Sequence, residues 1–127
     1  MSTLPRILLI DDEPTVLSML YQFLKLRFEV AFLSDHSAAM TLIETEPFDI
    51  VLSDYMMPGM DGVTFFRRLM VTHPEIRRVL LTGYAPDGVI QEALRDSVIH
   101  LCLCKPISLA SLSTQLLQLL ETRSVKS

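Results

Sequence analysis

Short, nearly all-apolar runs alternate with longer amphipathic segments along the chain, and no repeat or low-complexity stretch interrupts the alternation. Such runs are typical of strands that are buried on both faces of a sheet. They predict strands at Ile7–Ile10, Phe28–Leu33, Asp49–Ser53, Val79–Leu81 and Ile99–Cys104. Apolar residues at three- and four-residue spacings predict helices from Pro14 to about Leu26, Ser37–Glu46, Val63–Val71, Gly88–Asp96 and Ser108–Glu121.

Regular alternation of strands and helices predicts the α/β fold class, with a mostly parallel, doubly wound sheet that has helices on both faces. The length of 127 residues suits one domain and leaves no room for a second hydrophobic core. We therefore expect residues 1–127 to form a single domain.

Composition and net charge argue against several classes of protein. With 50% apolar and 20% charged residues, the chain is expected to be globular rather than disordered. The net charge of −4 and the absence of a basic run make direct nucleic-acid binding unexpected. No apolar run is long enough for a membrane span, and no signal peptide is evident. Cys102 and Cys104 are expected to be buried in the fifth strand. They are also expected to be unpaired, which fits a reducing cytoplasm.

Polar side chains follow four of the predicted strands at their carboxyl ends. Asp11 and Asp12 follow the first strand, Asp54 the third, Thr82 the fourth and Lys105 the fifth. In parallel sheets the ligand site lies beyond these strand ends. The sequence therefore predicts that these side chains meet at one rim of the sheet.

This set of residues suits metal-assisted phosphoryl transfer. Asp11, Asp12 and Asp54 offer the oxygen ligands that Mg²⁺ prefers, and a backbone carbonyl just after Asp54 can add another. A carboxylate can also act as a nucleophile and form an acyl phosphate. Lys105 can offset phosphoryl charge, and the Thr82 hydroxyl can donate a hydrogen bond to it.

Four segments in this order resemble the receiver domains of two-component response regulators over essentially the whole chain: Ile10–Glu13, Leu52–Gly62, Leu81–Ala85 and Lys105–Ile107. The resemblance implies a sheet of order 2-1-3-4-5, a cis Lys105-Pro106 bond and a cytoplasmic signalling role. Catalysis would be limited to self-phosphorylation and slow self-dephosphorylation, so the chain is not expected to be a metabolic enzyme.

The resemblance also implies residue roles. Asp54 would be the phosphoacceptor, with Asp11, Asp12, Asp54 and the Met56 carbonyl as Mg²⁺ ligands. Thr82 would be the switch hydroxyl and Lys105 the phosphoryl contact. The donor would be a histidine kinase or phosphotransfer protein. The output would be an effector domain after this chain or a separate target protein, and a homodimer is left open. Leu81–Ala85 also resembles receivers attached to cyclic-di-nucleotide phosphodiesterases.

Three positions depart from a common receiver pattern. Cys102 stands where many receivers carry an aromatic switch residue, and Tyr84 is the nearest aromatic that could take over that role. Met56 and Tyr84 are bulky and are expected to shield an acyl phosphate from water. Isolated histidines and the pairs Arg67-Arg68 and Arg77-Arg78 are interpreted as structural or solvated, with His36 placed near the surface.

Two other functions compete with phosphorylation. A pseudo-receiver would act only as a protein-binding module, and an inability to bind Mg²⁺ would favour it. A flavodoxin-like FMN carrier can share the strand order, but it needs a phosphate-cradling loop after the first strand. The acidic segment Asp11–Pro14 has the wrong charge for that loop.

Overall fold

The computed structural model describes residues 4–125 and the side chains of residues 4–121. Five strands alternate with five helices, as expected. The strands are β1 (Arg6–Ile10), β2 (Glu29–Leu33), β3 (Ile50–Asp54), β4 (Arg77–Thr82) and β5 (Leu101–Cys104). The helices are α1 (Pro14–Leu24), α2 (Ala39–Thr45), α3 (Gly62–Thr72), α4 (Val89–Arg95) and α5 (Leu109–Val125).

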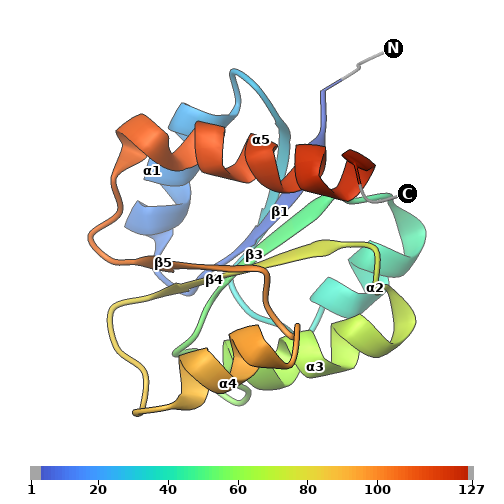
Figure 1. The fold of residues 1–127 in the computed structure, drawn as a ribbon. Coiled ribbons are helices and arrows are strands. Elements are labelled where there is room, and N and C mark those ends of the chain that lie inside the picture. Colours follow the sequence, from blue (N-terminus) through green and yellow to red (C-terminus); the bar gives the residue numbers. More distant parts are fainter. Residues whose placement is uncertain (1–3, 126–127) are drawn as a thin grey trace.

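The strands form one parallel sheet of order β2-β1-β3-β4-β5, which confirms the expected topology. The order reverses direction at β1 and β3, so the loops that follow these two strands diverge to opposite faces of the sheet. Figure 1 shows α1 and α5 on one face and α2, α3 and α4 on the other. This arrangement places the carboxyl ends of β1 and β3 at the centre of one rim.

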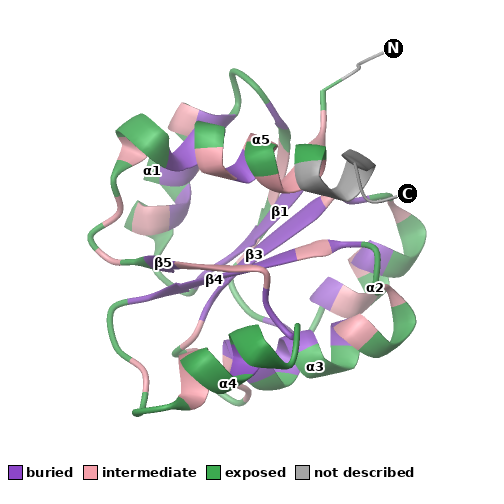
Figure 2. Cartoon of the chain, viewed as in Figure 1, coloured by how far each residue is buried: buried purple, intermediate pink, exposed green. Residues whose placement is uncertain are grey.

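Two hydrophobic cores lie on the two faces of the sheet. Alternate strand residues such as Leu8 and Val51 pack beneath α2, α3 and α4, while their neighbours Ile7 and Ile50 pack beneath α1 and α5. The residues of β1, β3 and β4 therefore meet a helix layer on each face, and Figure 2 shows these three strands at the buried centre of the molecule. Burial on both faces explains why the strands are almost continuously apolar.

Some element boundaries differ from the sequence-based expectation. β4 begins at Arg77, two residues before the predicted Val79, because two arginines precede its apolar core. Helix α2 is shorter than predicted and begins only at Ala39.

Arg78 is not a solvated surface residue, contrary to the expectation from sequence. Its side chain is buried and donates hydrogen bonds to the carbonyls of Pro74, Ile76, Ser97 and Val98, at 3.2, 2.9, 2.9 and 2.7 Å. These bonds satisfy a buried guanidinium and tie the start of β4 to the segment before β5. Burial lowers the pKa of Arg78 from its ordinary value.

The two cysteines are free thiols. They occupy alternate positions of β5 and therefore share one face of the sheet. Cys102 is half-buried against the α2–α4 core, whereas Cys104 is exposed rather than buried as expected. Within residues 4–125, none of the helices has the length and apolar character needed to cross a membrane.

Candidate phosphoacceptor site

Backbone hydrogen bonds fix the strand ends that form the rim. The Lys105 amide donates to the Thr82 carbonyl at 2.9 Å, and the Tyr55 amide donates to the Leu81 carbonyl at 3.0 Å. The peptide bond between Lys105 and Pro106 is cis, as the resemblance implied. These bonds hold the ends of neighbouring strands together, and the side chains that follow the strands extend from there.

Lys105 lies at the centre of an acidic cluster. Its Nζ atom is 3.1 Å from Asp54 Oδ2, 3.3 Å from Asp11 Oδ2 and 2.8 Å from Glu13 Oε1. Burial alone would lower the pKa of Lys105, but hydrogen bonds to Glu13 and Asp54 and the charges of Asp11 and Asp54 outweigh it, so the pKa lies above its ordinary value. The ammonium therefore stays charged beside Asp54.

Asp11, Asp12 and Asp54 also come together, as the strand ends predicted. Carboxylate oxygens of these three residues lie within 4.8 Å of one another. Asp12 is exposed, whereas Asp11 and Asp54 are buried. The cluster therefore opens to solvent on the Asp12 side, where a hydrated cation can approach.

Asp11 is the most deeply buried carboxylate of the cluster. Its Oδ1 accepts a hydrogen bond from the Glu13 amide at 2.9 Å, whereas its buried Oδ2 accepts none. Burial raises the pKa of Asp11, and the Asp54 charge adds to this, against the opposing effects of the Glu13 amide and Lys105. This oxygen has only its ion pair with Lys105 at 3.3 Å, and a hard divalent cation would give it a ligand bond, so these residues fit Mg²⁺.

Glu13 is a member of the cluster that sequence reasoning did not assign. It is adjacent to the predicted Asp11-Asp12 pair, but nothing in its position indicated that it would pair with a residue 92 positions away. Its contact with Lys105 is the shortest of the three ion pairs.

Thr82 lies at the rim, but its hydroxyl is engaged elsewhere. Thr82 Oγ1 donates to the Tyr84 carbonyl at 2.6 Å and accepts from the Tyr84 amide at 2.9 Å. The hydroxyl is thus tied to the loop that follows β4 rather than to Asp54. Moving it toward Asp54 would break both bonds and shift that loop.

The three positions that depart from the common receiver pattern have different surroundings. Met56 and Tyr84 are exposed, at 59% and 67%. The Met56 amide reaches Asp54 Oδ1 at 3.4 Å, so Met56 directly adjoins Asp54. Cys102 instead packs in the core on the α2–α4 side, where burial raises the pKa of its thiol.

His36 is buried beneath the rim, which corrects its expected surface position. Its Nε2 lies 2.9 Å from Ser53 Oγ, and its ring stacks on Phe65 with centroids 4.5 Å apart. Ser53 Oγ also donates to the Asp54 carbonyl at 2.9 Å, so the His36 ring is linked to the end of β3 through Ser53. His36 thereby supports the backbone of Asp54.

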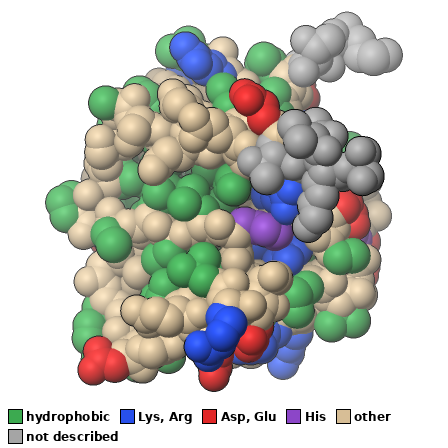
Figure 3. Space-filling view, in the orientation of Figure 1, with side chains coloured by type: hydrophobic (Ala, Val, Ile, Leu, Met, Phe, Trp, Pro, Cys, Tyr) green, Lys and Arg blue, Asp and Glu red, His purple; other side chains and the backbone are tan. Residues whose placement is uncertain are grey.

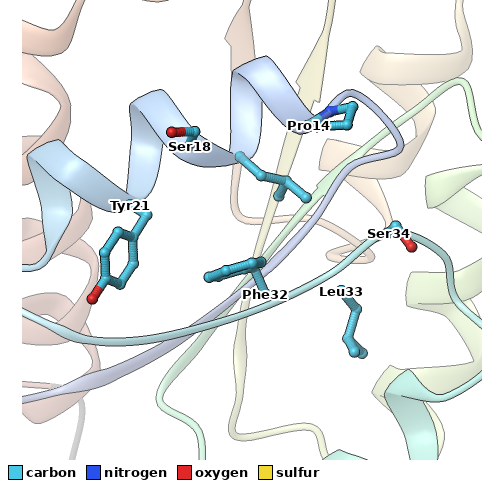
Figure 4. Close-up of a pocket in the computed structure, with 7 residues that line it drawn as sticks. Pro14, Ser18, Tyr21, Phe32, Leu33 and Ser34 are labelled. Atoms are coloured by element: carbon cyan, nitrogen blue, oxygen red, sulfur yellow. The ribbon is translucent and has the colours of Figure 1, made fainter.

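A separate apolar pocket lies between α1 and β2. Figure 4 shows Tyr21 and Phe32 facing it from these two elements, with Ser34 at the end toward the β2–α2 loop. Its volume is about 460 Å³, and its lining residues include no charged side chain. It is therefore chemically distinct from the acidic cluster.

Comparison with known proteins agrees with this geometry. Residues 7–117 match the response regulator receiver domain family. CpdR of Brucella abortus, a response regulator receiver protein, is 31% identical over 121 residues, which cover 91% of this chain and 96% of CpdR. RpfG of Xanthomonas campestris, a cyclic di-GMP phosphodiesterase response regulator, is 33% identical over 122 residues, covering 92% of this chain and 32% of RpfG.

Solved structures share the fold. The signal receiver domain of an HD domain-containing protein from Pseudomonas fluorescens is 31% identical, with a TM-score of 0.89 and coverage of 99% of this chain and 93% of that one. The chain spans only 8% to 21% of the length of three further relatives, two transcriptional regulators and a sensor kinase. The chain belongs to the response regulator receiver domain family of two-component signalling.

Proposed function

We propose that this receiver domain accepts a phosphoryl group on Asp54 in a Mg²⁺-dependent reaction and thereby switches a partner-binding or effector-binding surface. The position of Lys105 Nζ, 3.1 Å from Asp54 Oδ2 within the acidic cluster, is the observation that carries the proposal. It pairs a nucleophilic carboxylate with a fixed positive charge, as phosphoryl transfer requires.

In the proposed step, one Asp54 oxygen forms a bond to phosphorus as the bond between phosphorus and the donor breaks. The leaving group keeps the electron pair, as an acetate ion from acetyl phosphate or as an imidazole from a phosphohistidine. The positive charge of the Lys105 ammonium offsets the negative charge of the phosphoryl oxygens. The Met56 amide, 3.4 Å from Asp54 Oδ1, orients the attacking carboxylate.

Asp11, Asp12, Asp54 and the Met56 carbonyl would hold the Mg²⁺ ion. When bound, Mg²⁺ supplies positive charge that neutralises the oxygens around phosphorus. The buried Asp11 Oδ2, which accepts no hydrogen bond, supports this assignment. By calorimetry, we expect Mg²⁺ binding to weaken at least about tenfold in Asp12→Asn, since a charged ligand is lost. Unchanged Mg²⁺ affinity would contradict this ligand set.

Phosphorylation is proposed to pull Thr82 toward the new group. The hydroxyl would leave the Tyr84 backbone, and the loop that follows β4 would move with it. Because Cys102 is too small for a large inward rotation, we propose that Tyr84 carries part of the switch. A Tyr84→Ala variant that transmits the same activation-linked NMR shifts would contradict this role.

Met56 and Tyr84 are proposed to lengthen the life of the acyl phosphate. Both side chains are exposed, and Met56 adjoins Asp54, so the two can restrict the approach of water. We expect faster hydrolysis in Met56→Asn, whose short amide can bind water. An unchanged half-life would rule out the shielding role of Met56.

We propose that the phosphoryl donor is a cytoplasmic histidine kinase or phosphotransfer protein, and that output leaves through α4, β5 and α5. Figure 3 shows hydrophobic side chains gathered on both sides of β5, between α5 and α4. The similarity to RpfG, a cyclic di-GMP phosphodiesterase response regulator, supports control of such a phosphodiesterase, attached or separate.

The proposal is tested by incubation with acetyl phosphate in Mg²⁺ or in EDTA. We expect phosphoryl incorporation only with Mg²⁺, and strongly reduced incorporation in Lys105→Ala. Incorporation that is unaffected by EDTA would contradict the metal-dependent reaction. No incorporation and no Mg²⁺ binding would instead indicate a pseudo-receiver.

A further inference from the structure

Glu13 has an unusual place at the start of α1. It occupies the N-cap position, where a side chain often accepts a hydrogen bond from the first turn, but its carboxylate makes no such bond. Glu13 Oε1 instead accepts a hydrogen bond from Lys105 Nζ at 2.8 Å. The Glu13 side chain therefore contacts Lys105 at the rim of the sheet and does not cap the first turn of α1.

Three carboxylates surround the Lys105 ammonium group. This group carries three N–H donors, and it donates hydrogen bonds to Glu13 and Asp54 while it lies 3.3 Å from Asp11 Oδ2. A group bonded to Asp54 brings new oxygens to the same ammonium. These oxygens therefore compete with the existing carboxylates for the Lys105 ammonium.

The exposed fractions of the side chains decide which contact yields. Asp11 and Asp54 are held in place, with side chains 1% and 7% exposed. The Glu13 side chain is 58% exposed, so it can swing into water at little cost. Asp54 loses its carboxylate charge once its oxygen is bonded to phosphorus, so Asp11 and Glu13 are the charged carboxylates that remain beside Lys105. Of these two, Glu13 is the one that can leave Lys105 without leaving a buried charge unpaired.

We propose that Glu13 is a positioning residue that holds Lys105 in the resting state and competes with the phosphoryl group for its ammonium. This inference rests on the proposed phosphorylation of Asp54. Exposed ion pairs contribute modestly to stability, so removal of the competitor should favour binding at Asp54 by about two- to fivefold.

The test is an equilibrium titration of the full chain with beryllofluoride in saturating Mg²⁺, followed by ¹⁹F NMR. Beryllofluoride adds to a carboxylate as a phosphoryl mimic, so the readout is independent of turnover. Glu13→Gln removes the charge and weakens the contact. Glu13→Asp keeps the charge but shortens the reach to Lys105. Glu44→Gln, on the exposed side of α2, is the matched control.

We expect Glu13→Gln and Glu13→Asp both to bind beryllofluoride two- to fivefold more tightly, with Glu44→Gln unchanged. Unchanged binding in Glu13→Gln would overturn the proposal. Wild-type binding in Glu13→Asp would also overturn it, because charge alone would then explain the effect. A tenfold loss of Mg²⁺ affinity in Glu13→Gln would make Glu13 a metal ligand instead. If the wild type binds no beryllofluoride, the proposed function itself fails, and the inference falls with it.

Discussion

Gly62 packs directly against the backbone of Asp54. A Cβ atom at this position would lie 2.5 Å from the Asp54 carbonyl oxygen and 2.8 Å from Leu80 Cδ1. The Gly62 amide also donates to the Tyr55 carbonyl at 2.9 Å. The first turn of α3 can therefore approach the end of β3 this closely only because residue 62 has no side chain.

Gly62→Ala should lower the free energy of unfolding by roughly 1–3 kcal/mol, because the backbone of Asp54 must shift to admit a methyl group. Urea unfolding measures this change. Gly83→Ala is the control, since its Cβ would meet only Lys105 Cβ at an ordinary 3.7 Å. Equal stability of the two variants would contradict the close approach at Gly62.

His36 gives the fold a pH dependence. Burial lowers the pKa of His36, and this outweighs the Met60 backbone and the charges of Asp35, Asp61 and Asp54, which raise it. The unfolded chain therefore binds a proton more readily than the folded one. The stabilising effect is complete above the ordinary histidine pKa of about 6.5 and is lost as the pH falls toward the lower folded pKa.

His36→Phe should reduce the loss of unfolding free energy between neutral pH and mildly acidic pH. The phenyl ring can keep the stack on Phe65, and Ser53 Oγ still donates to the Asp54 carbonyl. Urea unfolding at both pH values measures the difference, with His73→Gln as control. A pH dependence that persists unchanged in His36→Phe would show that another group is responsible.

At the scale of elements, Arg78 connects two segments whose contact the hydrophobic pattern of the sequence does not predict. Its bonds to four carbonyls link the α3–β4 connection to the turn after α4. Arg78→Ala should therefore cost about 3 kcal/mol or more of unfolding free energy, because buried carbonyls lose their partners. Arg68→Ala, on the exposed side of α3, should change it by less than about 0.5 kcal/mol. Similar losses in both variants would contradict this account.

The strands could be predicted because burial on both faces leaves a continuous apolar signal, as in Ile7–Ile10. The start of β4 could not, since Arg78 is buried through backbone carbonyls that no local pattern reveals. The burial of His36 was missed for the same reason. Its partners Ser53 and Phe65 lie on β3 and α3, far along the chain.

At the scale of the whole molecule, the sheet order explains why the acidic cluster could be predicted. Parallel strands bring Asp11, Asp54 and Lys105 to one rim, and the ion pairs confirm that they meet. The Glu13–Lys105 contact needs side-chain geometry that strand order does not determine. The orientation of Thr82 toward Tyr84 likewise depends on the loop after β4.

The central claim is that Asp54 accepts the phosphoryl group, and intact-protein mass spectrometry tests it most directly. Wild type and Asp54→Asn are incubated with acetyl phosphate and Mg²⁺ side by side. The account predicts one added phosphoryl group on the wild type, removable by hydroxylamine as expected of an acyl phosphate, and none on Asp54→Asn. Equal addition to both proteins, or none to the wild type, would contradict it.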